Sequence, residues 1–276
     1  MYLKIKDLDV NYEIKGKGKP IVIIHGYTVD HRLMSGCIEP VLGESNEYKR
    51  IYIDLPGMGK TKSKDWIVNS DIMLDIVIEF INKIIPNENF LLAGESYGGY
   101  LSLGILYKMK ERVDGLCLLC PAISESHKEN REKPEHIVLM KDEELLSQLD
   151  KEDAEMFQSI QVVQTEETWT RYNNEILSGI KISDMDFLNN LNKNGIEFSF
   201  EKSLINEKFN KPTLFLLGHQ DSCVGYKEAW RILDNFERAT FAVLDMAGHN
   251  LQIEQPEVFN SLFSEWLKRV SLNNNI

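Results

Sequence analysis

The fold is decided by the stretch Asn89-Phe90-Leu91-Leu92-Ala93-Gly94-Glu95-Ser96-Tyr97-Gly98, which places a G-x-S-x-G pentapeptide directly after a short apolar run. The run predicts a buried strand, and the residues from Gly99 onward predict a helix. Between a strand and a helix, the serine of this motif sits in a strained turn that projects its hydroxyl from the sheet edge. The flanking glycines let the helix approach the strand closely. Ser96 is therefore predicted to be a nucleophile.

Short apolar runs recur along the chain and alternate with amphipathic stretches. Runs that are apolar on both faces are typical of strands in a parallel sheet covered by helices. The alternation predicts an α/β fold with a doubly wound sheet, preceded by a strand hairpin over residues 2–15. The strand-like runs are 21–24, 50–53, 90–93, 116–119, 213–217 and 241–244, and the helix-like stretches include 72–85, 100–110, 227–236 and 256–270.

One interval, residues 124–208, breaks this alternation because polar, helix-forming segments replace the buried strands. Aromatic residues recur in it, whereas a disordered linker would lack that apolar content. We therefore expect an α/β core formed by residues 1–123 and 209–276, with a helical cap, residues 124–208, inserted between two strands. Ligands bind at the carboxyl edge of such sheets, so the cap should lie over that edge. The helix-like segments are 134–149, 152–163, 167–177 and 183–192.

Composition argues against several classes of partner and site. The 276 residues carry a formal net charge of -12, which repels nucleic-acid phosphates and anionic membrane surfaces, so we expect neither as a partner. No run approaches the ~18 consecutive apolar residues of a membrane span. The charged, alternating start does not resemble a signal peptide, and we expect a cytoplasmic protein. Cys117 and Cys120 form a C-x-x-C, but the surrounding apolar run predicts a buried strand in place of a metal site.

A serine hydroxyl needs a histidine to take its proton and an acid to orient that histidine. After a serine in this strand–turn–helix setting, the acid and then the histidine follow along the chain. His249 lies in a loop at the end of a predicted strand and is the expected base. Asp221 lies in the loop after the strand 213–217 and is the expected acid, since Asp245 is too close along the strand to turn toward His249 and should cap the loop. His219 precedes the acid on the same loop and fits less well.

An oxyanion that forms at the nucleophile requires preorganised N–H donors. One should be the backbone amide of Tyr97, the residue after the serine. The second should come from the loop after an earlier strand, where His25-Gly26 permits a tight turn and the amide of Tyr27 can face Ser96. We expect His25 itself to be a structural hydrogen-bonding residue.

Taken together, these motifs resemble those of the α/β-hydrolase superfamily over nearly the whole chain. The resemblance implies a mostly parallel eight-stranded sheet, a helical cap inserted after the sixth strand, and a catalytic triad of Ser96, Asp221 and His249. It implies no metal and no organic cofactor. The matching motifs are His25-Gly26, Asp54-Leu55-Pro56-Gly57-Met58-Gly59 (a structural turn in that family), the turn at Ser96, Gly218-x-x-Asp221-x-x-Val224 and Gly248-His249.

Departures from other branches of the superfamily narrow the chemistry. Haloalkane dehalogenases and epoxide hydrolases carry an aspartate where this chain has Ser96, and carbon–carbon bond hydrolases often carry tryptophan where it has Asn250. The expected enzyme is a serine hydrolase that cleaves a small or medium carboxylic ester, thioester or lactone through an acyl-enzyme. Trp169, Tyr172 and Phe187 are expected either to line its substrate pocket or to pack between cap helices, and Arg171 is a candidate substrate contact.

Two alternatives stay open at this point. A cofactor-free acyl transferase or perhydrolase would share the first half-reaction and differ only in the second nucleophile. A slow-turnover ligand-binding module could keep the same fold and the same three residues, because fold does not fix function. In each case the expected partner is a small-molecule acyl substrate or ligand, and the oligomeric state is not predicted.

Overall fold

A single eight-stranded sheet organises the molecule in the computed structural model, which describes residues 1–43, 45–125, 131–204 and 206–273. The strand order is β1-β2-β4-β3-β5-β6-β9-β10; β1 and β2 form the predicted antiparallel hairpin, β2 also pairs antiparallel with β4, and the other pairs are parallel. The predicted α/β fold is confirmed. The strands are β1 (Tyr2–Ile5), β2 (Leu8–Lys15), β3 (Lys19–Ile24), β4 (Tyr48–Ile53), β5 (Phe90–Glu95), β6 (Val113–Leu119), β9 (Thr213–Gly218) and β10 (Ala239–Leu244).

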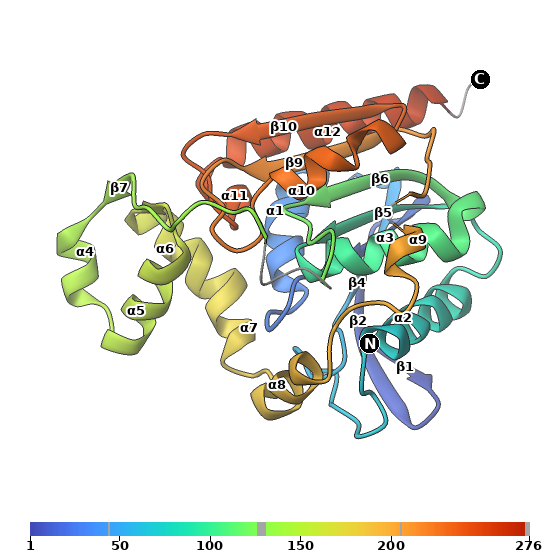
Figure 1. The fold of residues 1–276 in the computed structure, drawn as a ribbon, viewed down its shortest axis with the longest axis horizontal. Helices are drawn as coiled ribbons and strands as arrows, with labels where there is room; N and C mark the ends of the chain where they lie inside the picture. Colours follow the sequence, from blue (N-terminus) through green and yellow to red (C-terminus); the bar gives the residue numbers. More distant parts are fainter. Residues whose placement is uncertain (44, 126–130, 205, 274–276) are drawn as a thin grey trace.

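Two pairs of helices cover the two faces of this sheet (Figure 1). On one face α1 (Arg32–Leu42) packs against α12 (Pro256–Asn273), and on the other α2 (Ser70–Ile84) packs against α3 (Tyr97–Met109). Helix α1 was not predicted, because Gly36 and Pro40 weaken the helical signal of its sequence. The predicted helix 227–236 is divided into α10 (Lys227–Arg231) and a 3₁₀ turn.

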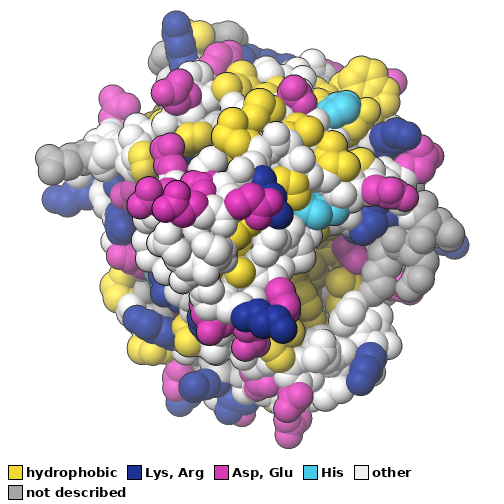
Figure 2. Space-filling view, turned by 90° about the vertical axis from the view of Figure 1, so that its left-hand side faces the viewer, with side chains coloured by type: hydrophobic (Ala, Val, Ile, Leu, Met, Phe, Trp, Pro, Cys, Tyr) yellow, Lys and Arg dark blue, Asp and Glu magenta, His cyan; other side chains and the backbone are white. Residues whose placement is uncertain are grey.

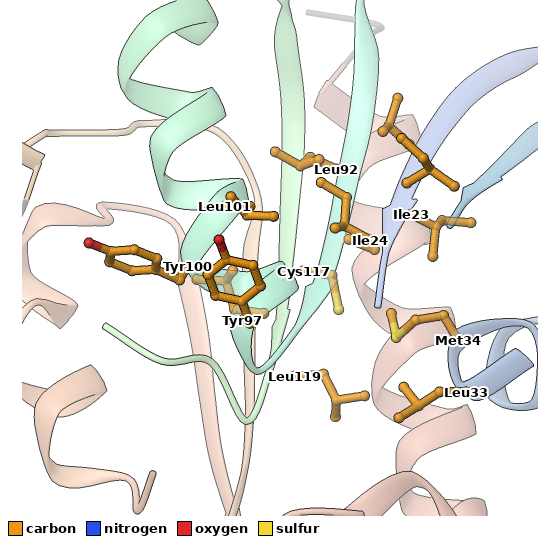
Figure 3. Close-up of a cluster of buried hydrophobic side chains, with 14 of the residues drawn as sticks. Ile23, Ile24, Leu33, Met34, Leu92, Tyr97, Tyr100, Leu101, Cys117 and Leu119 are labelled. Atoms are coloured by element: carbon orange, nitrogen blue, oxygen red, sulfur yellow. The ribbon is translucent and has the colours of Figure 1, made fainter. Parts of the chain in front are cut away.

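The core fills the space between the sheet and these helices (Figure 3). Strands β5 and β6 are buried along nearly their whole length, as their continuous apolar sequence requires. Cys117 is a buried free thiol in β6, which agrees with the predicted buried strand. Each large apolar side chain that is fully buried contributes about 1.5–3 kcal/mol, so this layer holds the edge of the sheet rigidly behind the turn at Ser96.

The chain between β6 and β9 leaves the sheet and forms helices beside it (Figure 1). The predicted helix 134–149 is mostly wrong: the described residues there form a short strand and then a six-residue helix that begins after the N-cap residue Asp142. A two-stranded parallel sheet, β7 with β8, was also not predicted. The elements are β7 (Met140–Lys141), α4 (Glu143–Gln148), α5 (Lys151–Ile160), β8 (Val163–Gln164), α6 (Glu166–Tyr172), a π-helical turn (Asn173–Leu177), α7 (Ser178–Ile180), α8 (Met185–Lys193) and α9 (Glu201–Leu204).

The outer surface of this segment mixes apolar and acidic side chains (Figure 2). The residues 137–140 before α4 are each at least 39% exposed. None of the helices that the structure describes combines the length and the apolar character needed to pass through a bilayer. The division into core and cap at 123/124 and 208/209 stays a prediction.

Candidate active site

Ser96 occupies the turn between β5 and α3 with a strained backbone. Its φ of 52° and ψ of -116° lie outside the regions that residues with a side chain normally adopt. The surrounding backbone holds this conformation: the amide of Ser96 donates to the carbonyl of Leu119 at 3.0 Å, and its carbonyl accepts from the amides of Tyr100 at 3.1 Å and Ala122 at 3.0 Å. Strain retained by so many contacts is typical of functional sites.

The glycines around the serine are required by close backbone packing. A Cβ atom on Gly94 would lie 2.3 Å from the carbonyl oxygen of Gly98, and one on Gly98 would lie 2.3 Å from the carbonyl oxygen of Ile24. Both distances are far below ordinary van der Waals contact. Helix α3 therefore begins directly against the ends of β5 and β3, as the motif predicts.

The structure brings Ser96, His249 and Asp221 together. The Nε2 atom of His249 lies 2.9 Å from Oγ of Ser96, and its Nδ1 atom lies 2.9 Å from Oδ2 of Asp221. The other carboxylate oxygen of Asp221 accepts hydrogen bonds from the amides of Cys223 at 2.8 Å and Val224 at 3.0 Å. These contacts fix the orientation of the carboxylate and, through it, that of the imidazole.

Burial and charge act in opposite directions on the two ionisable partners. Burial alone would lower the pKa of His249, but the negative charge of Asp221, together with Cys223 and Glu95, holds this pKa well above its ordinary value. Burial would likewise raise the pKa of Asp221, but the charge and hydrogen bond of His249 and the two backbone amides hold it below its ordinary value. Asp221 therefore stays ionised, and its negative charge stabilises the protonated form of His249, as is required of the acid beside a histidine that accepts a proton.

The rival residues lie elsewhere. The exposed Asp245 accepts a hydrogen bond from Nε2 of Gln220 at 2.7 Å, and Gln220 in turn accepts from the amide of Ala247 at 3.1 Å. Asp245 thus links the loop after β9 to the loop after β10, in keeping with the expected capping role. The ring of His219 stacks on Tyr226, and its Nδ1 atom lies 3.3 Å from Nε2 of Gln220.

Of the two predicted oxyanion donors, Tyr97 follows Ser96 directly in the chain and Tyr27 lines the same cavity as Ser96. No described residue accepts a hydrogen bond from the backbone amide of Tyr27 or of Tyr97. Their side chains are held apart from the reaction: the hydroxyl of Tyr27 donates to the carbonyl of Leu188 at 2.5 Å, that of Tyr97 lies 2.7 Å from Oγ of Ser70, and the rings meet edge to face. The amides are therefore the groups left for an oxyanion, although this role stays a prediction.

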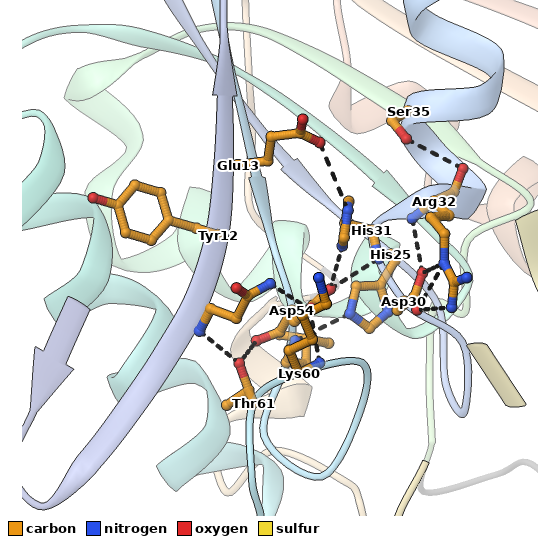
Figure 4. Close-up of polar contacts among 12 residues, drawn as sticks. Tyr12, Glu13, His25, Asp30, His31, Arg32, Ser35, Asp54, Lys60 and Thr61 are labelled. Atoms are coloured by element: carbon orange, nitrogen blue, oxygen red, sulfur yellow. Dashed lines mark hydrogen bonds and ion pairs between the residues drawn. The ribbon is translucent and has the colours of Figure 1, made fainter. Parts of the chain in front are cut away.

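A buried polar network fixes the loop that carries Tyr27 (Figure 4). Nε2 of His25 accepts a hydrogen bond from the amide of Leu55 at 3.0 Å, which agrees with the expected structural role of this histidine. The neighbouring Asp54 is fully buried, and its carboxylate accepts from the side chain of Asn11 at 2.7 Å and the amide of Lys60 at 2.9 Å. Its other oxygen lies 2.7 Å from Nδ1 of His31. These contacts tie the loops after β3 and β4 together behind the serine.

Comparison with known proteins identifies the family. A family model described as alpha/beta hydrolase fold matches residues 19–256. The chain is an α/β hydrolase. A solved α/β superfamily hydrolase from Oenococcus oeni PSU-1 is similar, with a TM-score of 0.87 and 32% identity over 95% of this chain and 96% of that one. The predicted family and the predicted class, a hydrolase, are both confirmed.

Two curated relatives are more distant but cover most of the α/β hydrolase chain. The 2-hydroxy-6-oxo-6-(2'-aminophenyl)hexa-2,4-dienoic acid hydrolase of Metapseudomonas resinovorans is 24% identical over 95% of this chain and 88% of its own. The monoacylglycerol lipase ABHD6 of Homo sapiens is 23% identical over 99% of this chain and 83% of its own.

A small cavity opens onto the serine of this α/β hydrolase. Its volume is about 90 Å³, well below the ~300–1,000 Å³ of most ligand pockets. Among the described residues around it there is no lysine or arginine. The lining comprises Tyr27, Thr28, Val29, Leu33, Glu95, Ser96, Ile160, Tyr172, Ile176, Ile180, His249 and Asn250.

Of the three aromatic residues expected at the pocket, the structure places one there. Tyr172 lines the cavity, whereas Trp169 packs on the rings of Phe157 and Tyr172. Phe187 packs against Gly57 in the loop after β4, where a Cβ would lie 2.4 Å from its ring, so it neither lines this cavity nor makes this contact between cap helices. The guanidinium of Arg171 binds Glu175 and the carbonyls of Gln252 and Gly36, and these contacts hold it in a structural role.

Glu95 is a site residue that the sequence reading missed. It precedes the serine, is 2% exposed, and its Oε1 atom lies 3.3 Å from Nε2 of His249. Burial and the nearby charge of Asp221 raise the pKa of Glu95 to about 7, against the lowering influence of His249. The signal was available: a carboxylate at the end of an otherwise apolar strand must face either solvent or a polar site.

Glu254 is a second missed residue, and it joins the loop of His249 to the segment between β6 and β9. Its carboxylate is buried in the short helix α11 (Leu251–Glu254). One oxygen accepts from the amide of Gly248 at 2.5 Å, and the other accepts from the amides of Val162 at 2.7 Å and Val163 at 3.3 Å. Three backbone donors thus depend on one side chain.

Glu254→Gln is expected to lower the free energy of unfolding by about 1–3 kcal/mol. The new amide group would place an N–H donor against a backbone N–H donor, which leaves a buried amide of Gly248 or of Val162 unsatisfied. Urea unfolding measures the loss, with Glu257→Gln as the matched control, because Glu257 is exposed at the start of α12. Equal stabilities for the two variants would contradict the role of Glu254.

Proposed function

We propose that the protein is a serine carboxylesterase that cleaves a small carboxylic ester through an acyl-enzyme on Ser96. The observation that carries this proposal is the continuous hydrogen-bonded line from Asp221 through His249 to the strained serine. In the proposed mechanism Ser96 attacks the acyl carbon while His249 takes its proton. Asp221 keeps the imidazole in the required tautomer, and the amides of Tyr27 and Tyr97 bind the oxyanion.

The second half of the reaction releases the acid. The first half ends when His249 gives the proton taken from Ser96 to the leaving alcohol. In the second half His249 removes a proton from an entering water molecule and returns it to the oxygen of Ser96 as the acid leaves. Water breaks the acyl bond to Ser96 and restores the hydroxyl. No step in this cycle draws on a metal or an organic cofactor.

Two observations bear on the substrate: the names of relatives support an ester, and the size of the cavity supports a short acyl group. The human relative is named as a lipase that acts on monoacylglycerol, and other curated relatives, in Legionella pneumophila, are named as methyl ester esterases over a shorter match. The cavity favours a short acyl group, since about 90 Å³ does not hold a long chain without movement of the residues around it. Thioesters and small lactones present the same acyl carbon and belong to the same proposal.

Labelling with a small fluorophosphonate tests the proposal directly. This reagent reacts with activated serines, so peptide mapping should find one adduct, on Ser96. His249→Ala should slow the labelling by several orders of magnitude while the protein stays folded. A folded wild-type protein that forms no adduct would contradict the proposal and favour the slow-turnover binding module.

Hydrolysis and acyl transfer are separated by the fate of the acyl group. With a short ester as donor and an added alcohol or peroxide, a hydrolase should deliver nearly all of the acyl group to water. A product dominated by the new ester or peracid at millimolar acceptor would instead identify a transferase or perhydrolase.

Gly26→Ala is expected to lower kcat/KM for ester hydrolysis by about 10²–10³, the effect of losing one oxyanion donor. A Cβ at position 26 would lie 2.0 Å from Oε2 of Glu95 and 3.2 Å from Cβ of Ser96, so the loop that carries the Tyr27 amide must shift. The double variant Gly26→Ala/Glu95→Ala removes the first contact and should recover part of the loss. Steady-state kinetics on a short ester measure both, and an unchanged kcat/KM in the single variant would contradict the assignment of this loop.

A further inference from the structure

Thr28 holds a backbone conformation that its residue type rarely adopts. Its φ is 68°, and among the described residues other than glycine with a positive φ it is the only β-branched one. A branched side chain in this region is a genuine outlier, and such strain persists only where the surrounding structure imposes it. Strain of this kind clusters at active sites, and Ser96 is itself an example in this chain.

The loop that carries Thr28 is held from two sides. On the side of the core, Nε2 of His25 accepts a hydrogen bond from the amide of Leu55 at 3.0 Å. On the other side, α7 packs against the backbone that follows Thr28, where a Cβ on Gly179 would lie 2.9 Å from the amide nitrogen of Asp30. Contacts on both sides of the loop therefore impose the conformation of Thr28.

The side chain of Thr28 brings an accessible hydroxyl to the active-site cavity. Thr28 lines this cavity together with Tyr27 and Ser96 and is partly exposed. No described residue makes a hydrogen bond to its Oγ1 atom, which keeps accessible surface. The hydroxyl of Tyr27, by contrast, is used by the carbonyl of Leu188. In a cavity of about 90 Å³ a bound acyl group lies close to every wall, so the hydroxyl of Thr28 is available to it.

An oxyanion at Ser96 forms in acidic surroundings. Asp221 is ionised, the carboxylate of Glu95 lies 3.3 Å from Nε2 of His249, and no described residue around the cavity is a lysine or an arginine. Nearby negative charges disfavour a further negative charge in a buried site. N–H and O–H donors must therefore supply the stabilisation, and donors that share one oxygen lie within about 6 Å of one another. The residue next to Tyr27 can place a side-chain donor within this range.

We propose that Thr28 is a further catalytic residue, whose hydroxyl donates a third hydrogen bond to the oxyanion beside the amides of Tyr27 and Tyr97. This inference rests on the proposed serine esterase function. A hydrogen bond to the carbonyl oxygen strengthens as negative charge develops on that oxygen, so the hydroxyl acts mainly on the transition state. Tyr172 also brings a hydroxyl to the cavity, but it belongs to α6 and not to the loop of the oxyanion amide.

Two substitutions of Thr28 test the role of the hydroxyl. Thr28→Val keeps the shape and the β-branching but removes the donor. We expect its kcat for a short ester to fall about 10–100-fold, with KM within about threefold of wild type, because a hydrogen bond to a charged group contributes this much. Thr28→Ser keeps the donor and should retain kcat within about fivefold. An unchanged kcat in Thr28→Val, or an equal loss in Thr28→Ser, would overturn the inference.

Thr28→Gly separates the hydroxyl from the strain of the backbone. Glycine adopts a φ of 68° without strain, so this variant should unfold at a urea concentration no lower than that of wild type. Its kcat should nevertheless fall about 10–100-fold, because the donor is gone. Full kcat in Thr28→Gly would overturn the inference, and so would a larger loss of kcat in Tyr172→Phe than in Thr28→Val.

A second measurement uses binding in place of turnover. Ethylboronic acid forms a tetrahedral adduct with an activated serine, and one oxygen of the adduct occupies the position of the oxyanion. Its inhibition constant should rise about 10–100-fold in Thr28→Val and stay within about fivefold of wild type in Thr28→Ser. Equal constants in wild type and Thr28→Val would overturn the inference. Failure of the proposed function looks different, since the wild-type protein would form no fluorophosphonate adduct on Ser96 and would hydrolyse no short ester.

Discussion

Replacement of Ser96 by alanine should reduce kcat for a short ester by about 10⁵–10⁶, because no other described hydroxyl lies against Nε2 of His249. The residual rate would come from the oxyanion amides and from binding alone. Fold and stability should change little, since the variant removes one oxygen and keeps the turn. Steady-state kinetics, with far-ultraviolet circular dichroism and urea unfolding, measure both properties on the same preparation.

Ser102→Ala is the matched control for this variant. Ser102 lies in helix α3, which begins directly after Ser96; it is fully buried and donates its hydroxyl to the carbonyl of Gly98 at 2.7 Å. It does not reach the imidazole, so its loss should leave kcat within about threefold of wild type. If Ser96→Ala kept more than about 1% of wild-type kcat, the acyl-enzyme on Ser96 would be ruled out.

The parts of the site that could be predicted from sequence are those set by local pattern. The turn at Ser96 combines an apolar strand, small flanking residues and a helix within ten positions, so its geometry follows from steric limits on neighbouring residues. Asp221 and His249 could be predicted to meet because each lies just after a strand, and the carboxyl ends of parallel strands meet at one edge. The structure brings Asp221 and His249 to that edge beside the serine.

The parts that could not be predicted depend on contacts between distant segments. Phe187 and Trp169 have the aromatic side chains expected of pocket residues, but Phe187 packs on Gly57 and Trp169 packs on Phe157. The strands β7 and β8 have two residues each and owe their pairing to tertiary packing. For Glu95, only the structure shows that its carboxylate lies 3.3 Å from Nε2 of His249.

Asp221→Asn should lower kcat by about 10⁴, the usual effect of losing the acid that orients a catalytic histidine. An asparagine can offer its amide group to Nδ1 of His249, which favours the tautomer that carries the proton on Nε2. That tautomer cannot take the proton of Ser96. Two backbone donors, the amides of Cys223 and Val224, can still be satisfied by the remaining carbonyl oxygen, so the loop should keep its structure.

The same variant should also shift the pH dependence of kcat/KM. This shift reports the charge of Asp221, whereas the fall in kcat reports its effect on the tautomer and orientation of His249. The base works only in its neutral form, so the acid limb of kcat/KM follows the pKa of His249. Asp221 raises this pKa, while burial lowers it. Asp221→Asn therefore should move the acid limb to lower pH as the plateau falls. Asp245→Asn is the matched control on the neighbouring loop and should leave both the plateau and the limb in place; a larger loss in Asp245→Asn than in Asp221→Asn would show that the acid has been assigned to the wrong strand.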